Sequence, residues 1–92
     1  MPVSGRRLAE VLSFVGANIR RLRIERGLTQ DRLATLSGQD LTYLQRVERG
    51  VTNLSVAVLV SIAAALEVSP GSLFRPTRIP QRPVGRPRKR PT

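Results

Sequence analysis

The chain has 92 residues, with sixteen Lys and Arg against six Asp and Glu, and neither cysteine nor histidine. A domain of this length buries only about 60% of the surface that its unfolded chain exposes, so one small, compact or oligomeric domain is expected. Without cysteine and histidine the chain lacks disulfides, thiolate metal ligands and the commonest general base. We therefore expect no enzyme activity, no metal site and no cofactor. The net charge of +10 favours a polyanionic partner, either nucleic acid or an anionic membrane.

A membrane-spanning segment is not expected. No apolar stretch approaches the roughly 18 residues that a transmembrane helix needs. An early apolar run, residues 8–15, contains Glu10 and is a poor candidate for a signal peptide. We therefore expect a cytoplasmic protein.

The positive charge is concentrated at the C-terminal end. Residues 75–92 hold seven of the sixteen cations and none of the six acids, so residues 1–74 carry nine cations, six acids and a net charge of +3. Five of the seven prolines also follow residue 75: Pro76, Pro80, Pro83, Pro87 and Pro91. Proline at this density excludes helix and sheet. The sequence therefore predicts a mildly basic domain over residues 1–74 and a basic, flexible or polyproline-II tail over residues 75–92.

Apolar residues recur at helical spacing in residues 1–74, which predicts an all-α domain of about five helices. The expected ranges are about 6–26, 30–37, 41–49 and 56–66, followed by a brief helix that opens at Pro70 and contains Leu73 and Phe74. Polar residues suited to cap the N-termini precede the last four of these: Thr29, Asp40, Ser55 and Ser69. Glycines are placed to end the first three: Gly27, Gly38 and Gly50.

The segment from Thr29 to Gly50 has the spacing of a helix-turn-helix: a short helix, a tight turn and a second helix. Leu44 and Val47 would hold the second helix to the core. The residues expected on its other faces, at or near solvent, are Leu41, Thr42, Gln45 and Arg46. A helix with such a face fits the major groove of DNA, although helix pairs of this kind also occur as plain packing units.

Further residues within 16–74 stand at the spacing of a known family. They are Ile19-Arg20, Leu22-Arg23, Gly27-Leu28-Thr29-Gln30, Leu33-Ala34, Gly38, Arg46-Val47-Glu48-Arg49-Gly50, Asn53, Ala63, Leu66, Val68-Ser69-Pro70 and Leu73-Phe74. In these positions the chain resembles the Cro and lambda-repressor type of helix-turn-helix domain, the xenobiotic-response-element family of bacterial and phage regulators. The resemblance covers about two thirds of the chain. It implies a compact five-helix, lambda-repressor-like domain that binds double-stranded DNA, and it extends to the dimeric controller proteins of restriction-modification systems.

The resemblance assigns base reading to the second helix of the pair. The positions that match base-contacting residues are Leu41, Thr42 and Arg46, and Gln45 is the next candidate for base reading. Arg46 is the candidate for a bidentate contact with guanine, which is worth about 1–3 kcal/mol of discrimination. Leu41 departs from the polar residue usual in the family, and either packs against a thymine methyl group or makes no contact.

A second group of residues is implied to contact backbone phosphates: Gln30, Tyr43, Arg49, Thr52, Asn53 and Ser55. Three of them have alternatives. Gln30 could support the recognition helix or be only a polar residue at a helix start, Tyr43 could pack over the turn, and Ser55 is also an N-cap. Arg23 and Glu48 match positions that family members often join by a buried ion pair, so both are left out of the DNA contacts. Removal of one partner of such a pair costs about 3–5 kcal/mol.

The helix expected over residues 56–66 is apolar on nearly all sides and requires a second covering surface. Homodimerisation is the simplest source of that surface, through an interface at Val58, Val60, Ala64 and Phe74. Twofold symmetry would then present two recognition helices to half-sites about 34 Å apart. The alternative is burial under the N-terminal part of the first helix.

The tail contains a second resemblance, to the AT-hook, a short Gly-Arg-Pro core that lies in the minor groove of A/T-rich DNA. It rests on Gly85, Arg86, Pro87, Arg88 and Lys89. Glycine and proline keep such a strand thin, and the cations match the negative potential of a narrow groove. Val84 stands where the motif usually has arginine. Non-specific phosphate contact and a solvated or partner-binding tail are the alternatives.

The sequence therefore predicts a sequence-specific, double-stranded DNA-binding transcriptional regulator, a dimeric repressor or autoregulator, in the cytoplasm with the nucleoid. No membrane and no small-molecule ligand are expected as partners. The rival interpretation is a protein-interaction module on the same fold, such as an antitoxin or a transcriptional adaptor.

Overall fold

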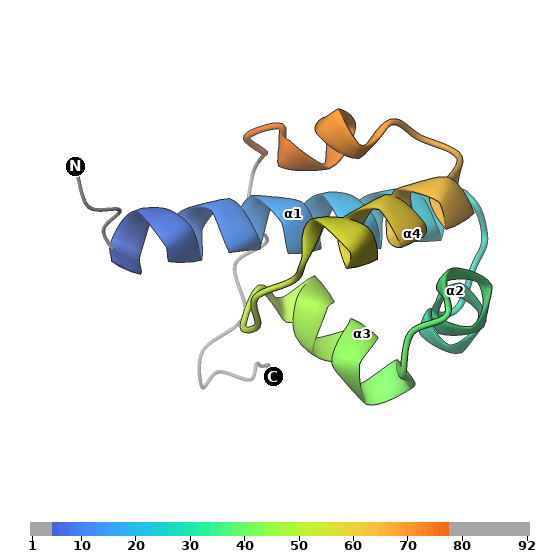
Figure 1. The fold of residues 1–92 in the computed structure, drawn as a ribbon. Coiled ribbons are helices and arrows are strands. Elements are labelled where there is room, and N and C mark those ends of the chain that lie inside the picture. Colours follow the sequence, from blue (N-terminus) through green and yellow to red (C-terminus); the bar gives the residue numbers. More distant parts are fainter. Residues whose placement is uncertain (1–4, 78–92) are drawn as a thin grey trace, which may run out of the picture.

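The structure is a computed structural model, and it describes residues 5–77. Four α-helices and one 3-10 helix form the domain (Figure 1). They are α1 (Gly5–Glu25), α2 (Gln30–Ser37), α3 (Leu41–Arg49), α4 (Val56–Leu66) and η1 (Pro70–Phe74). The all-α prediction is confirmed, and residues 5–77 contain no strand. None of the helices in this part of the chain combines the length and apolarity needed to cross a membrane.

The last element differs from the helix that the sequence predicted. Pro70–Phe74 forms a 3-10 helix, in which the Ser72 amide donates to the Ser69 carbonyl at 3.1 Å. The Ser72 hydroxyl donates to the same carbonyl at 2.6 Å, while the Ser69 side chain makes no capping bond. Five residues beginning with proline and glycine are too few for a stable α-helix, and the tighter i to i+3 pattern is the usual form of such short segments.

The other predicted N-caps are confirmed. The side-chain oxygens of Thr29, Asp40 and Ser55 accept from amides three residues later at 3.0, 3.2 and 3.1 Å. Each bond satisfies a backbone donor that the first turn leaves without an intrahelical partner, and each contributes about 1 kcal/mol. These local signals explain why the boundaries of α2, α3 and α4 agree with the sequence prediction.

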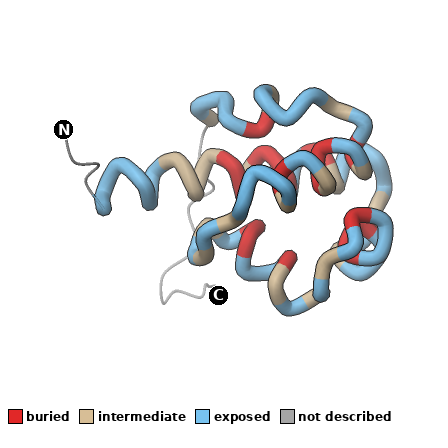
Figure 2. The backbone as a smooth tube through the Cα atoms, viewed as in Figure 1, coloured by how far each residue is buried: buried red, intermediate tan, exposed pale blue. Residues whose placement is uncertain are grey.

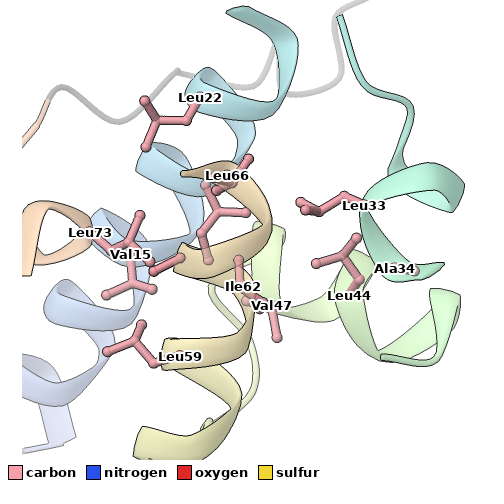
Figure 3. Close-up of a cluster of buried hydrophobic side chains, with 12 residues drawn as sticks. Val15, Leu22, Leu33, Ala34, Leu44, Val47, Leu59, Ile62, Leu66 and Leu73 are labelled. Atoms are coloured by element: carbon pink, nitrogen blue, oxygen red, sulfur yellow. The ribbon is translucent and has the colours of Figure 1, made fainter. Parts of the chain in front are cut away.

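The core lies where all five elements meet (Figure 3), and α1 spans the domain (Figure 1). The second half of α1 is the part that carries buried residues, whereas its first turns are exposed (Figure 2). α1 packs mainly on α3 and η1, and α2 packs on α4. η1 therefore lies on the opposite side of α1 and α4 from α3 (Figure 1). The buried apolar residues are Val15, Ile19, Leu22, Leu33, Ala34, Leu44, Val47, Leu59, Ile62, Ala63, Leu66 and Leu73.

Two glycines let α1 lie directly against the C-terminal end of α3. A Cβ on Gly16 would stand 2.5 Å from the Val47 carbonyl oxygen and 2.6 Å from that of Glu48. A Cβ on Gly50 would stand 3.0 Å from the Ser13 Cα, and Gly50 also has φ +74°, which side-chain-bearing residues rarely adopt. The backbones of α1 and α3 are therefore in direct contact, which fixes the position of α3 on the domain.

Asn18 joins α1 to the end of the described chain. Its side chain is buried and its Nδ2 donates to the carbonyls of Leu73 and Arg75 at 3.0 and 2.9 Å. The buried amide thereby satisfies two carbonyls that follow η1 and fixes where the chain leaves the domain. Beyond residue 77 the predicted tail lies outside the described residues.

Candidate nucleic-acid interface

α2 and α3 form the helix-turn-helix. Gly38 ends α2 at φ 72°, and its amide donates to the Ala34 and Thr35 carbonyls. The amide of Gln39 also donates to the Ala34 carbonyl, at 2.8 Å, and Asp40 then caps α3. The turn is thus closed by bonds within its own backbone, which sets the angle between the two helices.

One face of α3 is free for a partner. Thr42, Gln45, Arg46 and Arg49 are exposed, and their spacing of i, i+3, i+4 and i+7 places them on a single stripe. The opposite stripe is buried and consists of Leu44, Val47 and Glu48. The exposed stripe carries a hydroxyl, an amide and two guanidinium groups, which are the donors and acceptors that read base edges and phosphates.

Leu41 and Tyr43 flank this stripe, and both are half-buried against the core. The Tyr43 hydroxyl donates to the Asn53 carbonyl at 3.2 Å, which connects α3 to the loop before α4. A tyrosine hydroxyl has a single proton, and here that proton is used inside the domain. The geometry favours the packing alternative for Tyr43 over a donated bond to a phosphate.

The loop between α3 and α4 carries the other predicted phosphate contacts. Asn53 and Ser55 are exposed, and Thr52 is half-buried with its hydroxyl 3.4 Å from the Asn53 carbonyl. The Ser55 oxygen accepts from the Val58 amide, which leaves its hydroxyl proton for another acceptor. Arg49 stands at the start of this loop, so a cation, an amide and hydroxyls border the exposed stripe of α3.

An ion pair lies beneath the stripe. Arg23 donates through Nε to Glu48 Oε2 at 2.7 Å and through Nη2 to Oε1 at 3.1 Å. Its Nη1 donates to the Leu28 carbonyl at 2.9 Å. The two side chains are 11% and 2% exposed, so this bidentate pair joins α1, the loop before α2 and α3 almost out of contact with water.

Gln30 extends this pair to the surface. Its Nε2 donates to Glu48 Oε1 at 3.1 Å, and its Oε1 accepts from Gln45 Nε2 at 3.3 Å. Gln30 therefore contacts two side chains of α3. The link to Gln45 was not foreseen from the sequence, although the i, i+3 spacing of Gln45 and Glu48 would allow one side chain from α2 to touch both.

The residues predicted for the dimer interface differ in their exposure to solvent. Val60 and Phe74 are 46% and 48% exposed, and Ala64 is also exposed, on the same face of α4 as Val60. Val58 is half-buried and packs on the domain's own core, so it offers less surface to a partner. The N-terminal part of α1 borders the start of α4 at an open apolar pocket of about 170 Å³. Its lining includes Leu8, Val11, Leu12, Val56, Leu59 and Phe74.

Two further predictions concern a metal and the tail. Among residues 5–77, no cluster of three or more His, Cys, Asp or Glu side chains is placed to hold a metal ion. The AT-hook-like residues Gly85 to Lys89 lie outside the described residues.

Comparisons with known proteins identify the family. The sequence pattern of the helix-turn-helix family matches residues 19–73, more than half of the chain. The HTH-type transcriptional regulator y4dJ of Sinorhizobium fredii is 43% identical over 68 residues, which cover 74% of this chain and 88% of that protein. The restriction-modification controller protein C.AhdI of Aeromonas hydrophila has a similar structure, with a TM-score of 0.67, 43% identity, and coverage of 68% of this chain and 96% of that one. The biofilm regulator SinR, solved in complex with DNA, has a TM-score of 0.63, 34% identity, and coverage of 66% and 98%. The chain belongs to the Cro/C1-type helix-turn-helix family of DNA-binding transcriptional regulators.

Proposed function

We propose that this protein is a sequence-specific regulator that binds its operator as a homodimer and acts as a repressor or autoregulator. The observation that carries the proposal is the exposed stripe of α3, held on the domain by the Arg23–Glu48 pair and by the contact at Gly16. A helix fixed in this way can enter the major groove without the cost of ordering itself on binding. Double-stranded DNA is the proposed partner, which implies a cytoplasmic, nucleoid-associated protein.

The roles within the interface follow from what each side chain can still donate or accept. Thr42, Gln45 and Arg46 are proposed to read bases, because all three are exposed on the same stripe. Leu41 stands at its half-buried edge, where only a thymine methyl group offers it a matching contact. Phosphate contacts are assigned to Arg49, Thr52, Asn53 and Ser55, which border the stripe.

The dimer interface is proposed on α4 and η1. Val60, Ala64 and Phe74 expose apolar surface on these elements, which do not carry the reading stripe. Isologous pairing of the same face on two copies would cover it and leave both α3 helices free. Autoregulation of the controller-protein kind is the function that such a dimer on a symmetric operator would serve.

The C-terminal tail is proposed to enter the minor groove beside the operator. The described chain leaves η1 on the side of α1 and α4 opposite to α3 (Figure 1). Gly85 and Lys89 follow Thr77 by eight and twelve positions, and an extended chain of that length spans about 25–40 Å. This reach is similar to the diameter of a small domain, which is about 30 Å. The segment can therefore reach DNA bound on the opposite side.

Selection of bound sites from random double-stranded DNA tests the proposal, with the full chain and with a chain that ends at Thr77, which keeps the bond from Asn18 to the Arg75 carbonyl. The full chain should enrich a two-fold symmetric site, and its affinity should fall by about three to five orders of magnitude between 50 and 200 mM salt, if 6–10 phosphates are neutralised. Loss of the tail should weaken sites with A/T-rich flanks more than others. An equal loss of affinity at all sites would show that the tail contacts only phosphates.

The exposed apolar face of α4 also supports a second function, a protein-interaction module such as an antitoxin or a transcriptional adaptor. In that case Val60 and Ala64 would face a different protein. Sedimentation of the purified chain separates the two functions. A stable homodimer covers the face with a second copy, whereas a monomer that enriches no DNA sequence supports the interaction module.

A further inference from the structure

We infer that Gln30 is a positioning residue that fixes how the Gln45 amide faces DNA, and that the polarity of this amide is set by the buried Arg23–Glu48 pair. The inference rests on the proposed function, because it concerns which base Gln45 can read. It is carried by the continuous chain of hydrogen bonds from Arg23 through Glu48 and Gln30 to Gln45.

The direction of every bond in the chain follows from its buried end. Arg23 can only donate, and the Glu48 carboxylate can only accept. Gln30 must therefore turn its Nε2 toward Glu48, at 3.1 Å, which leaves its carbonyl oxygen toward Gln45. A carbonyl oxygen accepts only, so Gln45 must present Nε2, which lies 3.3 Å away. Rotation of either amide by 180° would bring two acceptors or two donors together.

The consequence lies at the exposed end. Since the Gln45 nitrogen donates to Gln30, the carbonyl oxygen of this exposed side chain is left to accept from a base. Such an acceptor matches a base that offers an amino group in the major groove, namely adenine N6 or cytosine N4. The second N–H of Gln45 can also reach adenine N7, whereas guanine O6 and thymine O4 would place an acceptor against an acceptor.

Without Gln30 beside it, Gln45 would discriminate less between adenine or cytosine and guanine or thymine. An exposed amide turns over between its two orientations, and it could then meet either a donor or an acceptor on the base edge. Gln30 thus contributes to specificity without touching the base. Its effect should appear at the single base position that Gln45 reads and not at the position read by Arg46.

The test compares the full-length chain with Gln30→Met, Gln45→Ala and the double variant in selection from random double-stranded DNA. Methionine has the length of glutamine but cannot bond Glu48 or Gln45. Gln39→Met is the matched control, because the Gln39 amide donates to the Ser37 carbonyl and stands outside the chain of bonds. The wild-type preference for adenine or cytosine at the Gln45 position should be about 5- to 150-fold, the range of a good bidentate contact.

Gln30→Met should reduce this preference severalfold and leave the other positions unchanged, and it should have no further effect when Gln45 is alanine. Two results would overturn the inference: a uniform loss of affinity with the preference intact, or a wild-type preference for guanine or thymine at the position that Gln45→Ala relaxes. A wild-type chain that enriches no sequence would overturn the proposed function itself.

A measurement without DNA covers the case in which Gln30→Met folds poorly. In the NMR spectrum of the free wild-type protein, one side-chain amide proton of Gln45 should be protected from solvent exchange relative to that of an exposed glutamine. Equal exchange of both protons would show that Gln30 does not hold the amide.

Discussion

Replacement of Glu48 by glutamine should destabilise the domain far more than the same replacement at an exposed carboxylate, such as that of Glu25. In Glu48→Gln, Arg23 keeps its charge at 11% exposure but loses its carboxylate partner. Removal of one member of a buried pair costs about 3–5 kcal/mol. A domain of about 70 residues has a free energy of unfolding of about 4–10 kcal/mol in total, so the variant should lose about a third of its stability or more.

Urea unfolding followed by circular dichroism measures the effect. Glu25→Gln is the matched control, because Glu25 pairs with Arg21 at 3.2 Å while both side chains are about half exposed. Such a surface pair contributes less than about 1 kcal/mol. The midpoint of Glu48→Gln should fall by more than about 1 M urea, and that of Glu25→Gln by a few tenths. Equal midpoints for the two variants would show that burial of the pair does not govern its contribution.

Three other predictions address the helix contact, the interface and base reading. Gly16→Ala should destabilise the domain by about 1–3 kcal/mol or more in thermal unfolding, because its Cβ would meet two carbonyl oxygens of α3, whereas Gly5→Ala, with nothing within 4 Å, should not. Val60→Lys should convert a dimer into monomers in analytical ultracentrifugation without changing the thermal unfolding of the monomer, since Val60 is 46% exposed. Arg46→Ala should relax the selected site at one guanine, a loss of about 1–3 kcal/mol in discrimination, and an unchanged consensus would contradict its assignment.

The helices whose N-terminal boundaries were predicted correctly are those that begin at a side-chain N-cap. Thr29, Asp40 and Ser55 each cap a helix by a bond to an amide three residues away, and such a bond depends on little else. No local signal of this kind distinguishes the 3-10 form of η1, because Ser69 has the type and position of a cap although its side chain makes no capping bond. Its carbonyl, and not its hydroxyl, makes the bonds that form the turn.

The site was predicted in its outline and not in its connections. Helical spacing alone separates the exposed stripe of α3 from its buried stripe, and the structure has the same division. The bond from Tyr43 to the Asn53 carbonyl and the bond from Gln30 to Gln45 depend on side-chain rotamers and on the angle between helices. Hydrophobic periodicity specifies neither the rotamers nor the angle between the helices, because both are set by tertiary contacts such as the one at Gly16.

The proposed base reading by Gln45 would couple stability and recognition in this domain through one carboxylate. Glu48 holds α3 to α1 through Arg23, and the same oxygen that accepts from Arg23 Nη2 also accepts from Gln30. Substitutions at Thr42 or Arg46 should change the site that is read at little cost in stability, because both residues are exposed and outside this chain of bonds. Substitutions at Gln45 should also be tolerated, but the base that they select will depend on Gln30. The two positions should therefore be redesigned together when the specificity of this domain is changed.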